Sequence, residues 1–230
     1  MINGKQIITK LISGSKFRKS RLHDMRGNFA GWNNIYRHLL PAFSLGIVRL
    51  AINYHPELPW ISYSAIKYID SYLTTKSRVL EYGSGFSTIW LSKHSGEVFS
   101  IEDDRNWYNK ISYIIQNQAL RNINYKFANS PGEYFNFMVD GLIGFDFILV
   151  DGSYRNKCVE SAIKLLKPGG ILYIDNSDNI GAGDLSIMQA EKGAIGFAEE
   201  KGGQITYFTD FVPGEFFVTQ GMLVKLPELE

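Results

Sequence analysis

Acidic, glycine and hydroxyl residues gather between positions 81 and 88, in the order Glu-Tyr-Gly-Ser-Gly-Phe-Ser-Thr. A short apolar run ending at Tyr82 precedes the glycines, which is typical of a strand that leads into a tight turn. Glycines in such a turn let a ligand approach the backbone, and the helix that follows offers free N–H groups. This stretch therefore predicts a binding site for a nucleotide-like ligand.

The spacing within the turn separates two kinds of nucleotide site. Glu81 stands two residues before Gly83, and Ser87 and Thr88 stand where a dinucleotide-binding turn has its third glycine. An acid at this position suits the amino and sulfonium groups of S-adenosylmethionine. Glu102 ends the next apolar run, where a carboxylate can accept hydrogen bonds from both ribose hydroxyls. We therefore expect S-adenosylmethionine as the cofactor; the alternatives are glycines that serve only the turn and a solvated Glu102.

Further polar groups end or follow two later apolar runs, at 145–151 and 171–175. Ligands bind at the carboxyl ends of strands in open α/β sheets, so these groups are candidates for holding an acceptor and removing its proton. Tyr154 is a candidate base or positioning group, with simple packing as the alternative. Arg155 is a candidate for neutralising an acidic substrate, with a solvated position at a helix start as the alternative.

Strand and helix patterns alternate through the part of the chain that carries these residues. Predicted strands cover 78–82, 98–102, 124–128, 145–151 and 171–175; predicted helices cover 65–73, 88–94, 106–119, 159–166 and 186–201, with a turn at 167–170. This alternation indicates an α/β, Rossmann-like fold with an open, mostly parallel sheet. The runs 204–211 and 216–226 are too close for a parallel crossover, so they predict an antiparallel hairpin with a reversed C-terminal strand. We expect a basic, mainly helical N-terminal appendage at 1–60 and a cofactor-binding domain at 61–230.

Three motifs resemble those of the class I S-adenosylmethionine-dependent methyltransferases. Residues 79–85 look like their motif I, 145–153 their fourth-strand motif, and 165–172 the turn into their fifth strand. The resemblance covers 65–226, and it implies that Glu102 holds the ribose, that Asn129 and Ser130 lie beside the adenine, and that Asp151 lies near the methionine end. The cofactor-binding residues that we expect are Glu81, Gly83, Ser84, Gly85, Ser87, Thr88, Glu102, Asp103, Asn129, Ser130 and Asp151.

The two later strand ends resemble the cation-dependent O-methyltransferases of the catechol and caffeoyl-CoA type. In those enzymes the corresponding aspartate and Asp-Asn pair bind a divalent cation, so the resemblance implies Mg²⁺ on Asp151, Asp175 and Asn176. The match departs at Tyr154, where those enzymes have lysine, and in a slightly shorter spacing between the two aspartates. A related group of bacterial methyltransferases carries Asp-Gly-Ser-His or Asp-Gly-Ser-Tyr without an established metal role. Sites with and without Mg²⁺ therefore both remain open.

The amino-acid composition indicates the kind of protein and the compartment in which we expect it. The chain has 230 residues, 45% of them hydrophobic and 20% charged, with a net charge of +1, as in soluble globular proteins. Cys158 is the only cysteine, which indicates a reducing compartment, so we expect a cytoplasmic protein. The most apolar stretch, 39–54, contains Pro41 and Arg49 and is too short and too interrupted to span a bilayer, so we expect no transmembrane segment.

These features predict an O-methyltransferase that acts on a small molecule or a sugar hydroxyl, with Asp151, Tyr154 and Arg155 as catalytic residues. Residues 1–60 carry a net charge of +7, so one alternative is an RNA or polymer methyltransferase that grips phosphates with this segment. Nucleic acid is the less favoured partner because the basic residues form no recognisable nucleic-acid module. The other alternative is a non-catalytic cofactor-binding module. The sequence is compatible with a homodimer and leaves the oligomeric state open.

Overall fold

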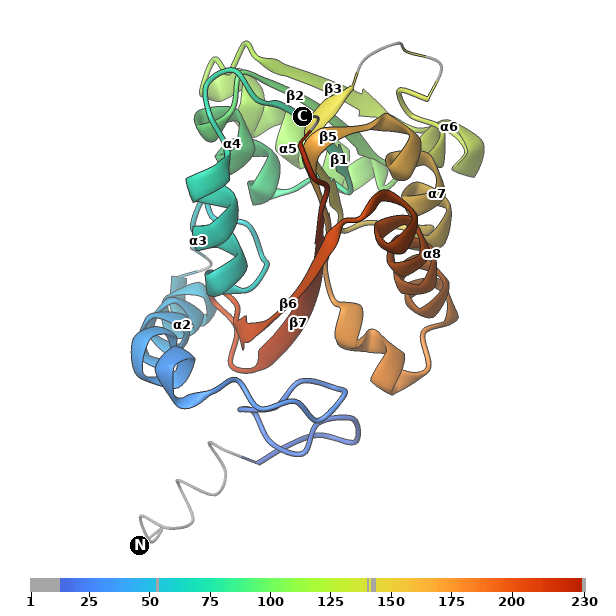
Figure 1. Cartoon of the computed structure of the whole chain (residues 1–230). Helices are drawn as coiled ribbons and strands as arrows, with labels where there is room; N and C mark the ends of the chain where they lie inside the picture. Colours follow the sequence, from blue (N-terminus) through green and yellow to red (C-terminus); the bar gives the residue numbers. More distant parts are fainter. Residues whose placement is uncertain (1–12, 53, 140, 142–143, 229–230) are drawn as a thin grey trace, which may run out of the picture.

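A seven-stranded sheet in the order β3-β2-β1-β4-β5-β7-β6 organises the computed structural model, which describes residues 13–52, 54–139, 141 and 144–228 (Figure 1). Its first five strands are parallel, and β7 runs antiparallel to both β5 and β6. The predicted Rossmann-like fold with a reversed C-terminal strand is therefore confirmed. The strands are β1 (Arg78–Tyr82), β2 (Glu97–Glu102), β3 (Ile123–Phe127), β4 (Phe145–Val150), β5 (Leu166–Ile174), β6 (Gln204–Phe211) and β7 (Val218–Lys225).

Helices cover both faces of the sheet (Figure 1). On one face, Ile69 and Trp90 from two helices pack with Phe147 of β4. On the other face, Ala162 and Ala194 pack with Ile148 of the same strand, because successive side chains of a strand point to opposite faces. The helices are α2 (Trp32–Ile52), α3 (Tyr63–Tyr72), α4 (Phe86–His94), α5 (Arg105–Asn117), α6 (Pro131–Phe135), α7 (Arg155–Leu165), the 3₁₀ helix η1 (Ser177–Ala182) and α8 (Leu185–Lys201).

The structure corrects three local predictions. The predicted turn at 167–170 belongs to β5, which pairs with β4 from Leu166 onward across an irregularity in register. Helix α7 begins at Arg155, earlier than predicted, because its first turn is polar and carries no apolar periodicity. Helices α6 and η1 were not predicted, since each is too short to show a helical repeat.

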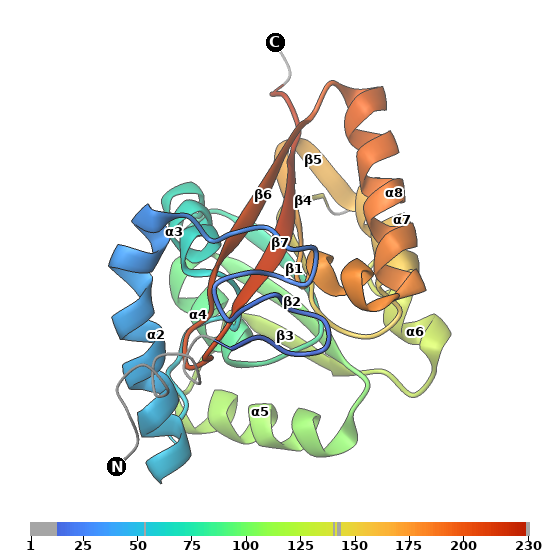
Figure 2. The same ribbon diagram turned by 90° about the horizontal axis from the view of Figure 1, so that it is seen from below.

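The described part of the predicted appendage is helical only in α2. Residues 13–31, here called the N-terminal segment, form an irregular chain with short bridges between Ser13 and Ser20 and between His23 and Phe29. In the view from below, this segment lies in front of the carboxyl edge of the sheet (Figure 2). Helix α2 packs beside β6, where Ala42 meets Phe211. The appendage is thus joined to the sheet over the edge where α/β folds bind ligands.

Candidate active site

The glycine turn after β1 is shaped by a close approach to the end of β4. Gly83 has a φ of +92°, and a Cβ added to it would lie 2.6 Å from the Cα of Gly152. Any larger residue would force the two strand ends apart. The turn leads into α4, where Thr88 Oγ1 accepts a hydrogen bond from the N–H of Gly85 at 3.0 Å and so caps the helix. The predicted strand, turn and helix are therefore in place.

Glu81 lies beneath this turn and is fully buried. Its Oε2 accepts hydrogen bonds from Thr88 Oγ1 at 2.5 Å and from Ser100 Oγ at 2.6 Å. Its Oε1 is buried with no hydrogen-bond partner among the described residues. Burial raises the pKa of Glu81 to about 7, against the hydrogen bonds, which lower it. The predicted contact of Glu81 with the cofactor stays a prediction, and the free Oε1 is the atom that it would use.

Glu102 ends β2 and lies in the wall of a cavity of about 620 Å³ beside the turn. Its Oε2 accepts hydrogen bonds from the N–H and hydroxyl of Ser84 at 3.1 and 2.7 Å. Its Oε1 accepts from the N–H groups of Asp103 and Asp104, each at 2.9 Å. The size of the cavity suits a nucleoside-sized ligand. The residues that line it are Gly83, Ser84, Glu102, Asp103, Asp104, Asn106, Trp107, Lys110, Asp151, Gly152 and Ser153.

Helix α5 supplies a wall that the sequence analysis missed. The Nε1 of Trp107 donates a hydrogen bond to the carbonyl of Ser84 at 2.7 Å, and the ammonium of Lys110 lies 4.4 Å from the centre of the Trp107 ring. Trp60 also joins this corner, with its ring 6.3 Å from that of Trp107. The two α5 residues are three apart, so they share a helix face. That spacing was the only signal in the sequence that Trp107 and Lys110 lie together. It does not indicate that this face of α5 packs against the turn after β1.

A second polar cluster lies where β4 and β5 end, and Arg155 is its centre. Its Nη2 donates to Asp151 Oδ1 at 3.1 Å and to Asn176 Oδ1 at 3.3 Å, while its Nη1 donates to the carbonyl of Asp175 at 2.5 Å. Its Nε reaches the carbonyl of Gly152 at 3.0 Å. The structure therefore brings together four of the predicted acceptor-side residues. It shows Arg155 as a bridge between two strand ends and not as a solvated side chain.

The two aspartates of this cluster interact electrostatically, and Asp175 is buried while the Asp151 side chain is 25% exposed at the cavity wall. Burial raises the pKa of Asp151 to about 6, although the Arg155 guanidinium lowers it. Burial and the charge of Asp151 together raise the pKa of Asp175 well above its usual range. Asp175 is 1% exposed, and its Oδ1 has no hydrogen-bond partner among the described residues. Two nearby carboxylates with one guanidinium therefore hold protons more tightly than free aspartates do.

This geometry does not fit the predicted Mg²⁺ site. A cation shared by Asp151 and Asn176 would have to lie between their Oδ1 atoms, where the Arg155 guanidinium already contacts both. Mg²⁺ needs near-octahedral oxygen ligands at about 2.0 to 2.1 Å, and the guanidinium between two of the three predicted ligands leaves no room for that shell. The sequence predicted the three oxygen ligands and named Arg155 as a candidate for the acceptor side. It gave no signal that the Arg155 guanidinium lies between those oxygens.

Other predicted residues lie farther from the cavity. Tyr154 adopts a left-handed conformation with φ of 52° at the start of α7, and its ring lies 6.0 Å from Tyr134. Asn129 and Ser130 are exposed after β3, where Ser130 caps α6 through Glu133. Their predicted roles, for Tyr154 at the acceptor and for Asn129 and Ser130 beside the adenine, stay predictions.

Several solved structures that match the chain are methyltransferases. The chain matches the O-methyltransferase TomG from Streptomyces achromogenes, solved with S-adenosylmethionine, at 18% identity and a TM-score of 0.61, over 86% of this chain and 97% of that one. It matches an O-methyltransferase from Bacillus cereus, solved with S-adenosylhomocysteine, at 21% identity and a TM-score of 0.57, over 84% and 96%. An rRNA methylase from Streptococcus thermophilus matches at 13% identity and a TM-score of 0.57, over 72% and 96%.

No protein-family model and no curated protein sequence matches the chain. The likeness is therefore one of structure, and at these identities it concerns the fold. The mostly parallel sheet with its antiparallel C-terminal hairpin is the feature that the chain shares with these enzymes. The chain has the fold of the class I S-adenosylmethionine-dependent methyltransferases.

Proposed function

We propose that the chain is an S-adenosylmethionine-dependent O-methyltransferase that acts on a hydroxyl of a small molecule or a sugar. The observation that carries this proposal is the adjacency of two sites at one sheet edge. The cavity beside Glu102 is lined on its other side by Asp151, which belongs to the Arg155 cluster. A cofactor held along this cavity would therefore end next to Asp151 and the Arg155 guanidinium that contacts it.

The cofactor supplies an electrophilic methyl carbon, so the protein has to align the acceptor and take up its proton. Glu102 and Ser84 are suited to holding a ribose, because the Ser84 hydroxyl can be exchanged for one from the ligand. Asp151 is the carboxylate that lies both in the cavity wall and in contact with Arg155. We assign Asp151 the role of proton acceptor, with Arg155 holding its carboxylate in place.

The charge of Arg155 supports a reaction without a divalent cation. In the catechol-type enzymes that the sequence resembles, the cation binds the acceptor oxygens. Here a guanidinium provides positive charge at the same strand ends, within 3.3 Å of Asp151 and Asn176. This arrangement favours acceptors that carry a hydroxyl near a negative group, because a guanidinium pairs well with anionic oxygens.

The RNA alternative receives less support from the described residues. An rRNA methylase shares the fold, but most of the basic side chains in the described N-terminal part are already bound to protein groups. Arg26 pairs with Glu191 at 2.6 Å, and Arg49 pairs with Glu215 at 2.7 Å. Arg18 lies 3.6 Å from Asp178. These arginines are thus committed to the fold and do not form a free surface for phosphates.

The test is calorimetric titration followed by a transfer assay. S-adenosylmethionine and S-adenosylhomocysteine are expected to bind with micromolar affinity, and NAD serves as the control ligand. A panel of hydroxyl acceptors, including catechols and sugars, is then incubated with methyl-labelled cofactor and with wild type or Asp151→Asn. Transfer to oxygen that is lost in the variant supports the proposal. Absence of cofactor binding would overturn the proposal, and cofactor binding without transfer to any acceptor would favour the non-catalytic alternative.

A further inference from the structure

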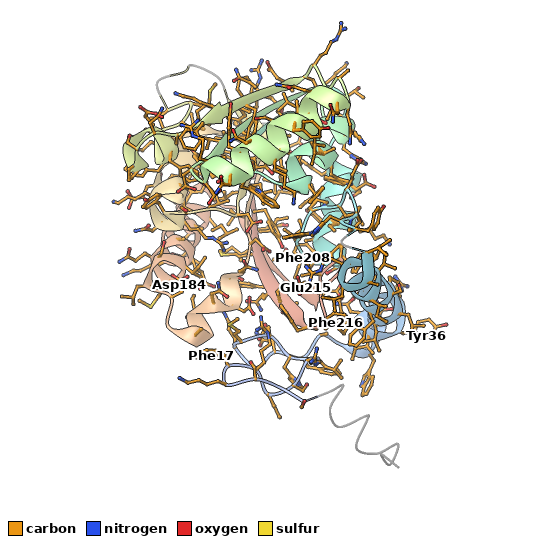
Figure 3. The ribbon with its side chains drawn as sticks, turned by 180° about the vertical axis from the view of Figure 1, so that it is seen from behind. Phe17, Tyr36, Asp184, Phe208, Glu215 and Phe216 are labelled. Atoms are coloured by element: carbon orange, nitrogen blue, oxygen red, sulfur yellow. The ribbon has the colours of Figure 1, made fainter. Side chains whose placement is uncertain are left out.

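Helix α2 exposes a stripe of apolar side chains that is interrupted by Ser44 between Leu40 and Ile47. Trp32, Tyr36, Leu40, Ile47 and Leu50 are 76, 88, 77, 60 and 73% exposed. They follow one another at three, four or seven residues, which keeps them on one side of a helix. Tyr36 points away from the domain (Figure 3). An exposed apolar face of this length indicates a site of contact with another protein or with a membrane.

The opposite side of α2 is fixed to the domain along its length. Near its start, His38 Nδ1 lies 2.7 Å from Asp210 Oδ2 of β6. Further along, Gly46 lies against the Phe216 ring, and Arg49 pairs with Glu215 just before β7 (Figure 3). These contacts hold the whole helix against the β6–β7 hairpin. The exposed stripe therefore faces outward while the helix axis stays parallel to the molecular surface.

By length and composition, α2 is also the one helix in the described part of the chain that could cross a membrane. Residues 39–54 were predicted to be too short and too interrupted to span a bilayer, but the helix begins at Trp32 and has 21 residues. Its polar contacts with Asp210 and Glu215 would be lost if it left the domain to span a bilayer. Such contacts fit a helix that lies on a membrane surface, with only its apolar stripe immersed.

The charge around the stripe selects the kind of surface. Residues 25–56 contain no acidic residue, and Arg37 is exposed beside the stripe. A second copy of the chain would bring two such faces together by symmetry, with Arg37 and no acid on either one. Anionic lipid headgroups complement Arg37, and acyl chains complement the stripe.

We propose that α2 docks the protein onto the surface of a bilayer that contains anionic lipids, with Leu40 and Ile47 at the boundary of the acyl chains. The hairpin residue Phe216 touches α2 and also lines a cavity of about 350 Å³ at the N-terminal segment, together with Arg18 and Arg21. This inference goes beyond methyl transfer and does not depend on it.

Vesicle flotation with the full chain tests the proposal. We expect wild type to float with vesicles of phosphatidylcholine and phosphatidylserine, and much less with phosphatidylcholine alone or in high salt. Replacing Leu40 and Ile47 together by Glu should weaken the binding about tenfold or more, since both side chains leave the apolar phase. The matched control replaces Leu185 and Met188 of α8 by Glu, because these residues are 65 and 46% exposed on another face.

Both double variants change exposed side chains, so their thermal unfolding midpoints should stay near that of wild type. Wild type that fails to float, or an α2 variant that floats as wild type does, would overturn the proposal. So would a wild-type dimer, seen by sedimentation without lipid, that the α2 variant converts to a monomer while neither protein binds vesicles. That last result would assign the stripe to a second copy of the chain.

Discussion

The two halves of the carboxyl edge are built in different ways. In the cofactor half, at the ends of β1 and β2, partners lie close in the sequence: Ser84 bonds Glu102 across 18 positions, and Thr88 bonds Glu81 across seven. In the acceptor half, which runs from the Arg155 cluster at the ends of β4 and β5 to the start of β7, Asp24 bonds Gln220 across 196 positions. Short motifs can therefore reveal the first half, whereas only the folded chain assembles the second.

The largest expected effect breaks the acceptor half at Asp24. This carboxylate is fully buried and accepts hydrogen bonds from Asn28, Thr209 and Gln220, among others. Asp24→Ala leaves these donors unpaired inside the protein, so we expect the free energy of unfolding to fall by about 4 kcal/mol. Urea denaturation measures this loss.

The comparison predicts that the cofactor half does not respond to Asp24→Ala. The affinity of the folded variant for S-adenosylmethionine should stay within about twofold of wild type, a difference of roughly 0.4 kcal/mol. Asp70→Ala is the control for stability, since its side chain is 55% exposed and contacts only His94 at 3.4 Å among the ion pairs. A large drop in cofactor affinity in the Asp24 variant would show that the two halves form one cooperative unit.

The next effect concerns the pH dependence of the cofactor half. The pKa of Glu81 rises from 4.5 to about 7 in the folded chain, because the carboxyl is buried. The folded state therefore keeps a proton that the unfolded chain releases. This stabilisation is fully present below pH 4.5 and is lost as the pH rises through 7, by about 3 kcal/mol in total.

Glu81→Gln carries no titrating proton and should remove this part of the pH dependence. We expect the difference in unfolding free energy between wild type and variant to change by about 3 kcal/mol between pH 4 and pH 8, without cofactor. Unfolding curves across this range give the value. Parallel pH profiles for the two proteins would mean that the pKa of Glu81 is the same in the folded and the unfolded chain.

A smaller effect is expected for ligand binding at Glu102. Glu102→Gln keeps the shape of the side chain but removes its charge, so the ribose loses charge-assisted hydrogen bonds. We expect S-adenosylmethionine to bind more weakly by about 2 kcal/mol, or roughly 30-fold, in a calorimetric titration. Glu97→Gln at the start of β2 is the control, because its side chain is half-exposed and far along the strand from the cavity. Equal affinities for wild type and the Glu102 variant would remove Glu102 from the site.

The features that could be predicted from the sequence also lie mainly in the sheet and in the cofactor half. The patterns at 78–82 and 204–211 predicted β1 and β6 with their observed bounds, because apolar runs beside turn residues are local signals. The turn, Glu102 and Asp151 were also local, and the structure places Glu102 and Asp151 in the wall of one cavity. Motifs therefore sufficed for the sheet and for much of the cofactor half.

The remainder depends on contacts between distant segments. Nothing near Arg26 in the sequence indicates that it bonds the carbonyl of Ser177, 151 positions away. The same holds for Met25, whose N–H donates to Asp178. Trp107 has a helical signal but no signal for the turn that it touches. The sequence thus indicated candidate residues for the site, while the structural partner of each depended on how the elements pack.

The smallest expected effect concerns Mg²⁺, and it sharpens the comparison at the point where the halves meet. Because Arg155 Nη2 already contacts Asp151 and Asn176, a cation would have to displace a guanidinium that makes five hydrogen bonds. The affinity for S-adenosylmethionine should therefore differ by less than about twofold between Mg²⁺ and a chelator. Mn²⁺, followed by its electron paramagnetic resonance, should remain free. In Arg155→Met the oxygen ligands lose their cation, so weak Mn²⁺ binding is expected to appear. Metal binding by wild type would mean that Arg155 swings out of the cluster, and that the acceptor half rearranges when it is loaded.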